Sequence, residues 1–330
     1  MRDDRTQISS HLIIYRRPEI KFNVDADHRT SIIEHRSSNI EHRIDHRASF
    51  KFLNGVQTNM ERSKKSKWWR RIQIIAIIYL AFGLVLYFLQ EKFLFHPDPL
   101  PEDHTFKFDQ PFTEVYLPVN AEKNLSIVKF TVPDSIRKGV VLYFHGNKNN
   151  IERYAPKAVY FTRNNYEVWM IDYPGYGKST GELTESILYE DALIMYNMAK
   201  AVVSVDSIIL YGKSLGTGIA AELASVRDSK RLILEAPYYS IDALASRYAF
   251  IYPVKWMMNY HFPTYKYLEK VREPVTMIHG TDDNTIPYRQ SKRLLKVAPA
   301  GTELITIEGG HHNDLAEFEV FGKKIDSLLR

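Results

Sequence analysis

One serine lies in a Gly-x-Ser-x-Gly pattern at a position where it could act as a nucleophile. The stretch Gly212-Lys213-Ser214-Leu215-Gly216 follows an apolar run typical of a buried strand and precedes a helical pattern rich in small residues. A serine on such a sharp strand-to-helix turn is exposed for attack, and the flanking glycines are needed because the neighbouring backbone comes too close for a β-carbon. The pattern predicts that Ser214 is presented as a nucleophile.

Two competing interpretations of the glycine-serine motifs fit the sequence less well. A second copy of the pattern, around Ser179, comes several residues after its strand has been ended by Pro174 and Gly175, so we expect a loop there, before a helix capped by Thr184. The Gly-Lys-Ser string at 212–214 also resembles the end of a phosphate-binding loop. That motif requires a glycine five residues earlier, where the chain has a serine inside an apolar strand.

A serine hydroxyl is a weak nucleophile near neutral pH and needs a base that is itself oriented by a third group. Candidates follow late predicted strands, in the chain order serine, acid, histidine that accompanies this kind of turn. Asp282 and Asp283 follow one strand, and His311 and His312 follow the last one. Neighbouring side chains generally point in different directions, so we expect one residue of each pair to face Ser214.

Acyl transfer also requires hydrogen-bond donors for the negative charge that develops on the substrate oxygen. The residue after the nucleophile, Leu215, would supply one backbone N–H group. The loop His145-Gly146-Asn147 follows an earlier predicted strand, and we expect the backbone of Asn147 to supply the second donor. His145 is more plausible as a structural residue of that turn.

A metal site is the main chemical alternative. The residue types would suit zinc or manganese, and the candidate ligands are His279, Asp282, Asp283, His311 and His312. However, the sequence has no HExxH or other helical spacing of metal ligands. A metal site would also give no chemical role to the Gly-x-Ser-x-Gly turn at Ser214. We therefore expect neither a metal nor a cofactor.

Composition and charge narrow the classes of function. The chain has 330 residues, of which 45% are hydrophobic and 25% charged, and it contains no cysteine, which excludes disulfides and cysteine-based chemistry. Residues 1–71 hold 16 of the 44 Lys+Arg and 9 of the 39 Asp+Glu, so the remainder of the chain is close to neutral. The basic charge belongs to the N-terminal part, and we expect no nucleic-acid partner.

Residues 72–89 form an uncharged apolar run which, as a helix, would extend about 27 Å, enough to cross a bilayer. Basic and aromatic residues precede the run: Lys64, Lys65, Lys67, Trp68, Trp69, Arg70 and Arg71. No small-residue cleavage pattern follows it. We predict an uncleaved single-pass anchor with a cytosolic N-terminus and the remaining domain on the non-cytosolic side, which in a bacterium would be the periplasm.

The sequence predicts three regions along the chain. Residues 1–59 are predicted to be a disordered, basic, His-rich arm; residues 60–92 the basic flank and anchor; and residues 93–330 the catalytic domain. Because Met60 opens a segment that already has the form of a complete membrane-anchor N-terminus, one hypothesis is that the native protein starts there.

Short apolar runs alternate with amphipathic stretches after residue 93, as expected of a mainly parallel α/β sheet. Buried strands are predicted at 140–144, 168–171, 207–210, 232–234, 275–278 and 304–307. Helices are predicted at 183–201, 216–225 and 314–329, and leading antiparallel strands within 101–132.

Several motifs together resemble the α/β-hydrolase superfamily, over about residues 93–330. They are YFHGN at 143–147, DYPGYGKS at 172–179, YGKSLG at 211–216, HGTDD at 279–283 and GGHHND at 309–314. The resemblance is strongest to membrane-anchored serine hydrolases, including acyl-protein thioesterases. It implies an α/β-hydrolase fold, with a mostly parallel central sheet, helices on both faces and a short cap at 236–273. It further implies that Asp283 and His312 are the acid and the base, although the doubled residues keep Asp282 and His311 as second choices.

We therefore predict a membrane-anchored serine hydrolase that cleaves a carboxylic ester or thioester of a small-molecule or lipid-like acyl substrate. The acyl-enzyme would form on Ser214, with His312 as acid and base and Asp283 orienting it. A serine aminopeptidase is the nearest enzymatic alternative. The alternative from a functional class other than enzymes is a non-catalytic, membrane-anchored interaction protein.

Overall fold

The computed structural model describes the backbone of residues 26–330 and the side chains from residue 47 onward. The chain divides into two units, Met1–Tyr79 and Leu80–Arg330. Helix α1 (Ala26–Leu94) contributes to both of them. The described backbone is helical from Ala26, and residues 1–25 of the predicted arm lie outside the described part.

The sequence of α1 explains why this helix is continuous. Residues 26–94 contain no proline and only two glycines, so nothing interrupts the backbone hydrogen bonds. Within α1, the segment Arg47–Leu94 is long and apolar enough to cross a membrane, and only 6% of its most apolar window is buried. The predicted run at 72–89 lies inside this segment.

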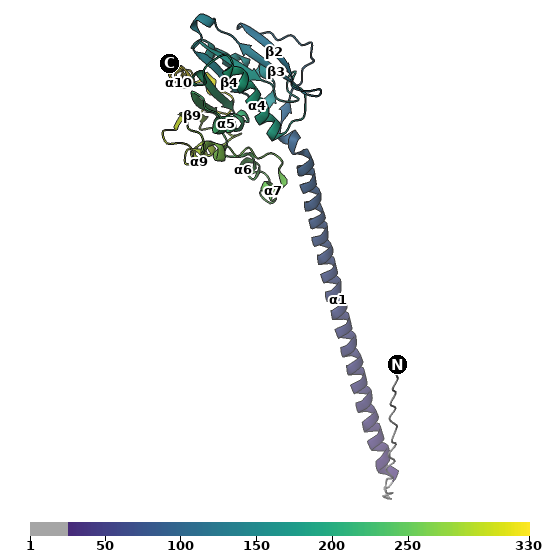
Figure 1. The fold of residues 1–330 in the computed structure, drawn as a ribbon. Coiled ribbons are helices and arrows are strands. Elements are labelled where there is room, and N and C mark those ends of the chain that lie inside the picture. Colours follow the sequence, from purple (N-terminus) through teal and green to yellow (C-terminus); the bar gives the residue numbers. More distant parts are fainter. Residues whose placement is uncertain (1–25) are drawn as a thin grey trace, which may run out of the picture. The chain divides into compact units, whose positions relative to one another are not determined.

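An eight-stranded sheet forms the centre of the unit Leu80–Arg330 (Figure 1), with the strand order β10-β9-β8-β7-β4-β6-β3-β2. The strands are β2 (Phe112–Pro118), β3 (Asn124–Phe130), β4 (Gly139–Phe144), β6 (Tyr166–Ile171), β7 (Ile208–Lys213), β8 (Arg231–Glu235), β9 (Val275–Gly280) and β10 (Glu303–Ile307). The strands from β6 to β10 in this order are parallel, whereas β3 is antiparallel to both of its neighbours. The predicted mainly parallel sheet with leading antiparallel strands is confirmed.

Helices cover both faces of this sheet. They are α2 (Ile151–Tyr154), α3 (Val159–Thr162), α4 (Glu185–Lys200), α5 (Gly216–Val226), α6 (Ile241–Ala245), α7 (Val254–Met257), α8 (Thr264–Leu268), α9 (Arg289–Leu294) and α10 (Glu319–Leu328), with short 3-10 turns at Asp134–Ile136, Ala155–Ala158, Val205–Ser207 and Leu315–Glu317. Thr184 caps α4 as predicted, with its hydroxyl accepting from the Ile187 N–H.

Alternate residues of the central strands supply two cores. In β4, Val140, Leu142 and Phe144 join the core that contains α4 and α5, whereas Val141 and Tyr143 join the core that contains α3 and α10. Side chains of a strand alternate between faces, so a strand buried on both sides must be apolar throughout. This accounts for the continuous apolar runs in the sequence.

A second, two-stranded sheet ties the end of α1 to the main sheet. Strand β1 (His96–Pro97) pairs in parallel with β5 (Lys148–Asn149). The His96 N–H donates to the Asn147 carbonyl at 2.9 Å, and the Asn147 side-chain amide donates to the Leu94 carbonyl at 2.8 Å. The last turn of α1 is therefore fixed to the loop that follows β4.

Candidate active site

Ser214 occupies the strained turn between β7 and α5. Its φ angle is 51°, in the left-handed region that residues with a side chain rarely adopt. A β-carbon at Gly212 would overlap the Gly216 carbonyl oxygen, and one at Gly216 would overlap the Phe144 carbonyl oxygen. The two glycines are thus required by close backbone approach, for the reason that the sequence pattern indicated.

The structure brings Ser214, His312 and Asp283 into one hydrogen-bonded chain. The Ser214 Oγ lies 2.9 Å from His312 Nε2, and His312 Nδ1 lies 2.7 Å from Asp283 Oδ2. A carboxylate at Nδ1 keeps the proton on that nitrogen, which leaves Nε2 free to accept the serine proton. The arrangement can therefore activate the serine hydroxyl.

Asp283 is buried and surrounded by donors. The N–H groups of Thr285 and Ile286 donate to its Oδ1 at 2.9 and 2.7 Å. Burial alone would raise its pKa, but hydrogen bonds from His279, His312 and the Ile286 backbone outweigh that effect and hold the pKa of Asp283 well below its usual range. The carboxylate therefore stays ionised beside His312.

His279 is a neighbour of this acid that sequence reasoning considered only as a metal ligand. It is fully buried, with Nε2 at 3.2 Å from Asp283 Oδ2 and 2.8 Å from the Ile286 carbonyl, and Nδ1 at 2.6 Å from Ser291 Oγ. Its place at the end of β9, four residues before Asp283, was the available signal. We interpret it as a positioning residue for the acid.

The second-choice residues lie outside this chain of hydrogen bonds. The exposed side chain of Asp282 accepts from the Thr281 hydroxyl at 3.0 Å. The ring of His311 is also exposed, and its Nδ1 lies 2.9 Å from the Asp282 carbonyl. Neither side chain is brought to Ser214.

Asn147 and Leu215, the predicted oxyanion donors, line the same pocket as Ser214. Among the residues that the structure describes, the backbone N–H of neither residue donates a hydrogen bond. Leu215 also stands at the start of α5, where the helix dipole favours negative charge. Both N–H groups are thus available for a substrate oxygen.

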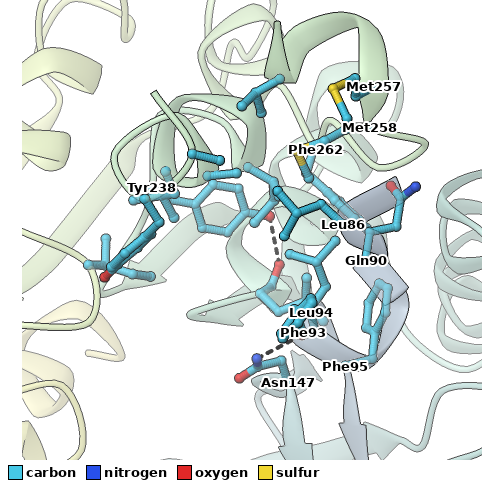
Figure 2. A pocket seen from close by; sticks show the side chains of 18 of the residues that line it. Leu86, Gln90, Phe93, Leu94, Phe95, Asn147, Tyr238, Met257, Met258 and Phe262 are labelled. Atoms are coloured by element: carbon cyan, nitrogen blue, oxygen red, sulfur yellow. Dashed lines mark hydrogen bonds between the residues drawn. The ribbon is translucent and has the colours of Figure 1, made fainter. Parts of the chain in front are cut away.

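An apolar pocket of about 510 Å³ opens over Ser214, within the usual range for small-molecule sites. Side chains from the end of α1 and from the segment after β8 point into it (Figure 2). That segment, residues 236–273, carries α6, α7 and α8 and is the predicted short cap. Among the described residues, no Asp, Glu, Lys or Arg lines the pocket.

A buried charge network lies beneath the serine. Lys213 Nζ donates to Glu235 at 2.5 Å and to the His312 carbonyl at 3.1 Å. Lys157 also pairs with Glu235, at 2.6 Å, and the Tyr211 hydroxyl hydrogen-bonds to the same carboxylate. Despite burial, the two ammonium groups hold the pKa of Glu235 well below its usual range, whereas burial lowers the pKa of Lys157 to about 8.

The remaining candidate residues have structural environments. Ser179 lies in a loop, and its buried hydroxyl accepts from the Ser126 N–H at 2.8 Å. His145 is fully buried, and its ring stacks on that of Tyr154 and packs at a tilt against that of Tyr173. Within the described part of the chain, no group of three or more His, Asp or Glu side chains is arranged to hold a metal ion.

Comparison with known proteins gives one family model and several curated relatives. The model, described as serine aminopeptidase S33, matches residues 135–270. The α/β-hydrolase domain-containing protein 17C of Xenopus tropicalis is 31% identical over 192 residues, which is 57% of this chain and 61% of that protein. The α/β-hydrolase domain-containing protein aho-3 of Caenorhabditis elegans is 32% identical over 167 residues, 50% of this chain and 49% of that protein. The chain thus covers between half and about three fifths of these relatives.

Solved structures share the fold at low identity. An esterase from Pyrococcus furiosus superposes with a TM-score of 0.56 and 17% identity, covering 72% of this chain and 96% of the esterase. A soluble variant of a monoglyceride lipase from Saccharomyces cerevisiae gives a TM-score of 0.52 and 18% identity, covering 69% of this chain and 98% of the lipase. At this level of identity the similarity bears on fold alone.

Proposed function

Because the chain belongs to the α/β-hydrolase superfamily, we propose that it is a serine hydrolase that cleaves a carboxylic ester or thioester through an acyl-enzyme on Ser214. The observation that carries the proposal is the chain of hydrogen bonds from Ser214 Oγ through His312 to Asp283. Fold by itself does not establish activity, and this geometry is what makes the site chemically competent.

In the proposed reaction, Ser214 Oγ attacks the carbonyl carbon while its proton passes to His312 Nε2. The N–H groups of Asn147 and Leu215 stabilise the negative charge on the carbonyl oxygen. His312 then returns the proton to the departing alcohol or thiol as the carbon–oxygen or carbon–sulfur bond breaks. Water activated by the same nitrogen hydrolyses the acyl-enzyme and regenerates the serine.

The lining of the pocket favours an acyl substrate over an aminoacyl one. An aminopeptidase must hold the positive α-amino group of its substrate, which calls for a carboxylate or a comparable acceptor. The lining of this pocket is instead almost entirely apolar, and none of its described side chains is charged. Typical lining residues are Leu86, Leu244, Tyr248 and Phe262. A neutral acyl chain would bury apolar surface there at no electrostatic cost.

The localisation is part of the same proposal. The apolar segment of α1 would anchor the chain in a membrane, since Arg47–Leu94 has the length and composition of a span. The basic residues before the span would stay in the cytosol, so the domain that carries Ser214 would lie on the other side.

A substrate panel tests the proposed activity. Purified full-length protein is assayed on p-nitrophenyl esters, acyl thioesters and aminoacyl anilides. We expect ester or thioester turnover that falls by about 10⁴-fold or more in Ser214→Ala, with an unchanged melting temperature.

Ser179→Ala is the matched control, because Ser179 lies in the other glycine-serine motif and belongs to the loop after β6. We expect this variant to keep its turnover. Turnover of the anilides alone, or equal activity of Ser214→Ala and the wild type, would contradict the proposal.

A further inference from the structure

The last turns of α1 form one wall of the pocket over Ser214. Leu86, Gln90 and Leu94 are spaced four residues apart, so they lie on one face of the helix, and all three line the pocket. Tyr87 and Phe93 extend this face on either side. Figure 2 shows the α1 side chains of Leu86, Gln90, Phe93 and Leu94 together with Tyr238 and Phe262, which follow β8 in the chain. We call the five α1 residues the helix wall.

The helix wall is fixed in place by hydrogen bonds at its middle and at its C-terminal end. The Gln90 side-chain oxygen accepts from the Asn259 N–H of the cap at 2.8 Å. The Leu94 carbonyl accepts from the side chain of Asn147, one of the two proposed oxyanion donors. The helix that would span the membrane is thus built into the substrate pocket.

The cap also meets α1 further along the apolar run. The ring of Phe82 lies 6.0 Å from that of Tyr252, and a β-carbon at Gly83 would press against the same tyrosine ring. Phe82 precedes Leu89, the last residue of the apolar run, by seven positions, which is about 10 Å along a helix. Part of the cap therefore lies beside residues that would be inside the hydrocarbon of a membrane.

The outer part of the cap has the composition of a membrane-contacting surface. In residues 247–257, here called the cap tip, Tyr248, Phe250 and Trp256 are 71%, 80% and 87% exposed. Arg247 and Lys255 lie among them, and residues 243–268 contain no Asp or Glu. Exposed aromatic and basic residues of this kind favour the interface of a bilayer, and such a patch is unusual on a surface that faces only water.

We propose that the pocket is loaded from the membrane: the cap tip inserts into the leaflet next to the domain, and the helix wall guides the long acyl chain of a membrane-resident acyl lipid to Ser214. The inference rests on the proposed hydrolase function and names its substrate class. A long chain gains about 0.8 kcal/mol per methylene group in hydrocarbon. A long acyl chain therefore leaves the bilayer readily only if it enters an apolar pocket that is continuous with the hydrocarbon of the membrane. The helix wall supplies that continuity.

A chain-length assay tests the helix wall. Full-length protein in phosphatidylcholine vesicles is given p-nitrophenyl palmitate in the bilayer or p-nitrophenyl acetate in the water. Leu86→Trp places a larger side chain on the helix wall and narrows the pocket, so we expect the ratio of kcat/KM for palmitate to kcat/KM for acetate to fall by at least about 10-fold. Leu84→Trp is the matched control, because Leu84 is exposed and does not line the pocket; both of its rates should stay near the wild type.

The outcomes separate the inference from the function on which it rests. If the wild type hydrolyses both esters and Leu86→Trp leaves palmitate turnover unchanged, or lowers both rates equally, the inference is overturned and the hydrolase proposal stands. If the wild type hydrolyses neither ester and Ser214 reacts with no phosphonate probe, both are overturned.

A second experiment tests insertion of the cap tip. The chain has no cysteine, so a single introduced cysteine can carry an environment-sensitive fluorophore without competing sites. With Phe250→Cys in vesicles, we expect brighter, blue-shifted emission that is quenched by doxyl-labelled lipids. Val320→Cys on α10, also exposed, is the control and should remain unquenched. A label at position 250 that behaves as water-exposed would overturn the proposal.

Discussion

At the scale of single residues, two pairs of identical neighbours end in different environments. Asp283 is buried among four donors while Asp282 is exposed, and His312 reaches Ser214 while His311 faces the Asp282 backbone. Sequence patterns placed both pairs after the correct strands. They left the choice within each pair open, because it depends on the turns after β9 and β10, whose hydrogen bonds orient each side chain.

Asp283→Asn should lower kcat by about 10²- to 10⁴-fold while preserving the fold. The amide cannot hold the proton on His312 Nδ1, so the imidazole loses its preferred tautomer and the stabilisation of its charged form. Asp282→Asn is the matched control and should stay within about 2-fold, since that exposed side chain hydrogen-bonds to Thr281 and lies outside the chain of hydrogen bonds to Ser214. Steady-state kinetics on one p-nitrophenyl ester compares the two, and a larger loss in Asp282→Asn would reverse the assignment.

At the scale of elements, the charge network under Ser214 joins parts of the chain that are far apart in sequence. Lys213 at the end of β7 and Glu235 at the end of β8 are partners across the two strands, and the same lysine holds the His312 carbonyl. The network therefore couples the turn that carries the nucleophile to the loop that carries the base.

This network also marks where prediction from sequence stops. The apolar runs predicted the six parallel strands to within a few residues, because five of these strands are buried on both faces and the edge strand β10 is partly buried. The burial of Glu235 depends instead on the register between β7 and β8. It also depends on the approach of Lys157, which lies 78 residues earlier in the chain. Neither is visible in the local pattern.

Glu235→Gln should destabilise the protein by about 3–5 kcal/mol near pH 7, because the ammonium groups of the buried Lys213 and the largely buried Lys157 lose their carboxylate. The pKa of Glu235 is lowered by folding, so its contribution is fully present above the unfolded value of about 4.3 and is lost as the pH falls toward the folded value. The difference in unfolding free energy between wild type and variant should therefore shrink below about pH 4. Denaturant unfolding at pH 7 and pH 3.5 checks this, and a difference that stays constant would contradict it.

At the scale of the whole molecule, the proposals place a hydrolase domain directly against the end of its own membrane helix. Composition predicted the apolar run, and the alternation of strands and helices predicted the α/β domain. The helix wall was not predicted, because it arises from contacts between residues 86–94 and a cap more than 140 residues away.

The basic residues before the span predict the side of the membrane on which the domain lies. A reporter fused after Arg330 should be active only in the non-cytosolic compartment, because Lys and Arg are retained in the cytosol. Alkaline phosphatase and a cytosol-specific fluorescent protein form a matched pair of reporters in a bacterial host. Fluorescence from the cytosolic reporter, with no phosphatase activity, would refute this orientation.

Mapping a covalent adduct tests the central claim most directly. The protein is treated with a fluorophosphonate, digested and analysed by tandem mass spectrometry, because an activated serine is the group such reagents modify. The account predicts one phosphonylated residue, Ser214, and loss of the adduct in His312→Gln but not in His311→Gln. An adduct on Ser179, or none on a protein that still hydrolyses esters, would contradict it.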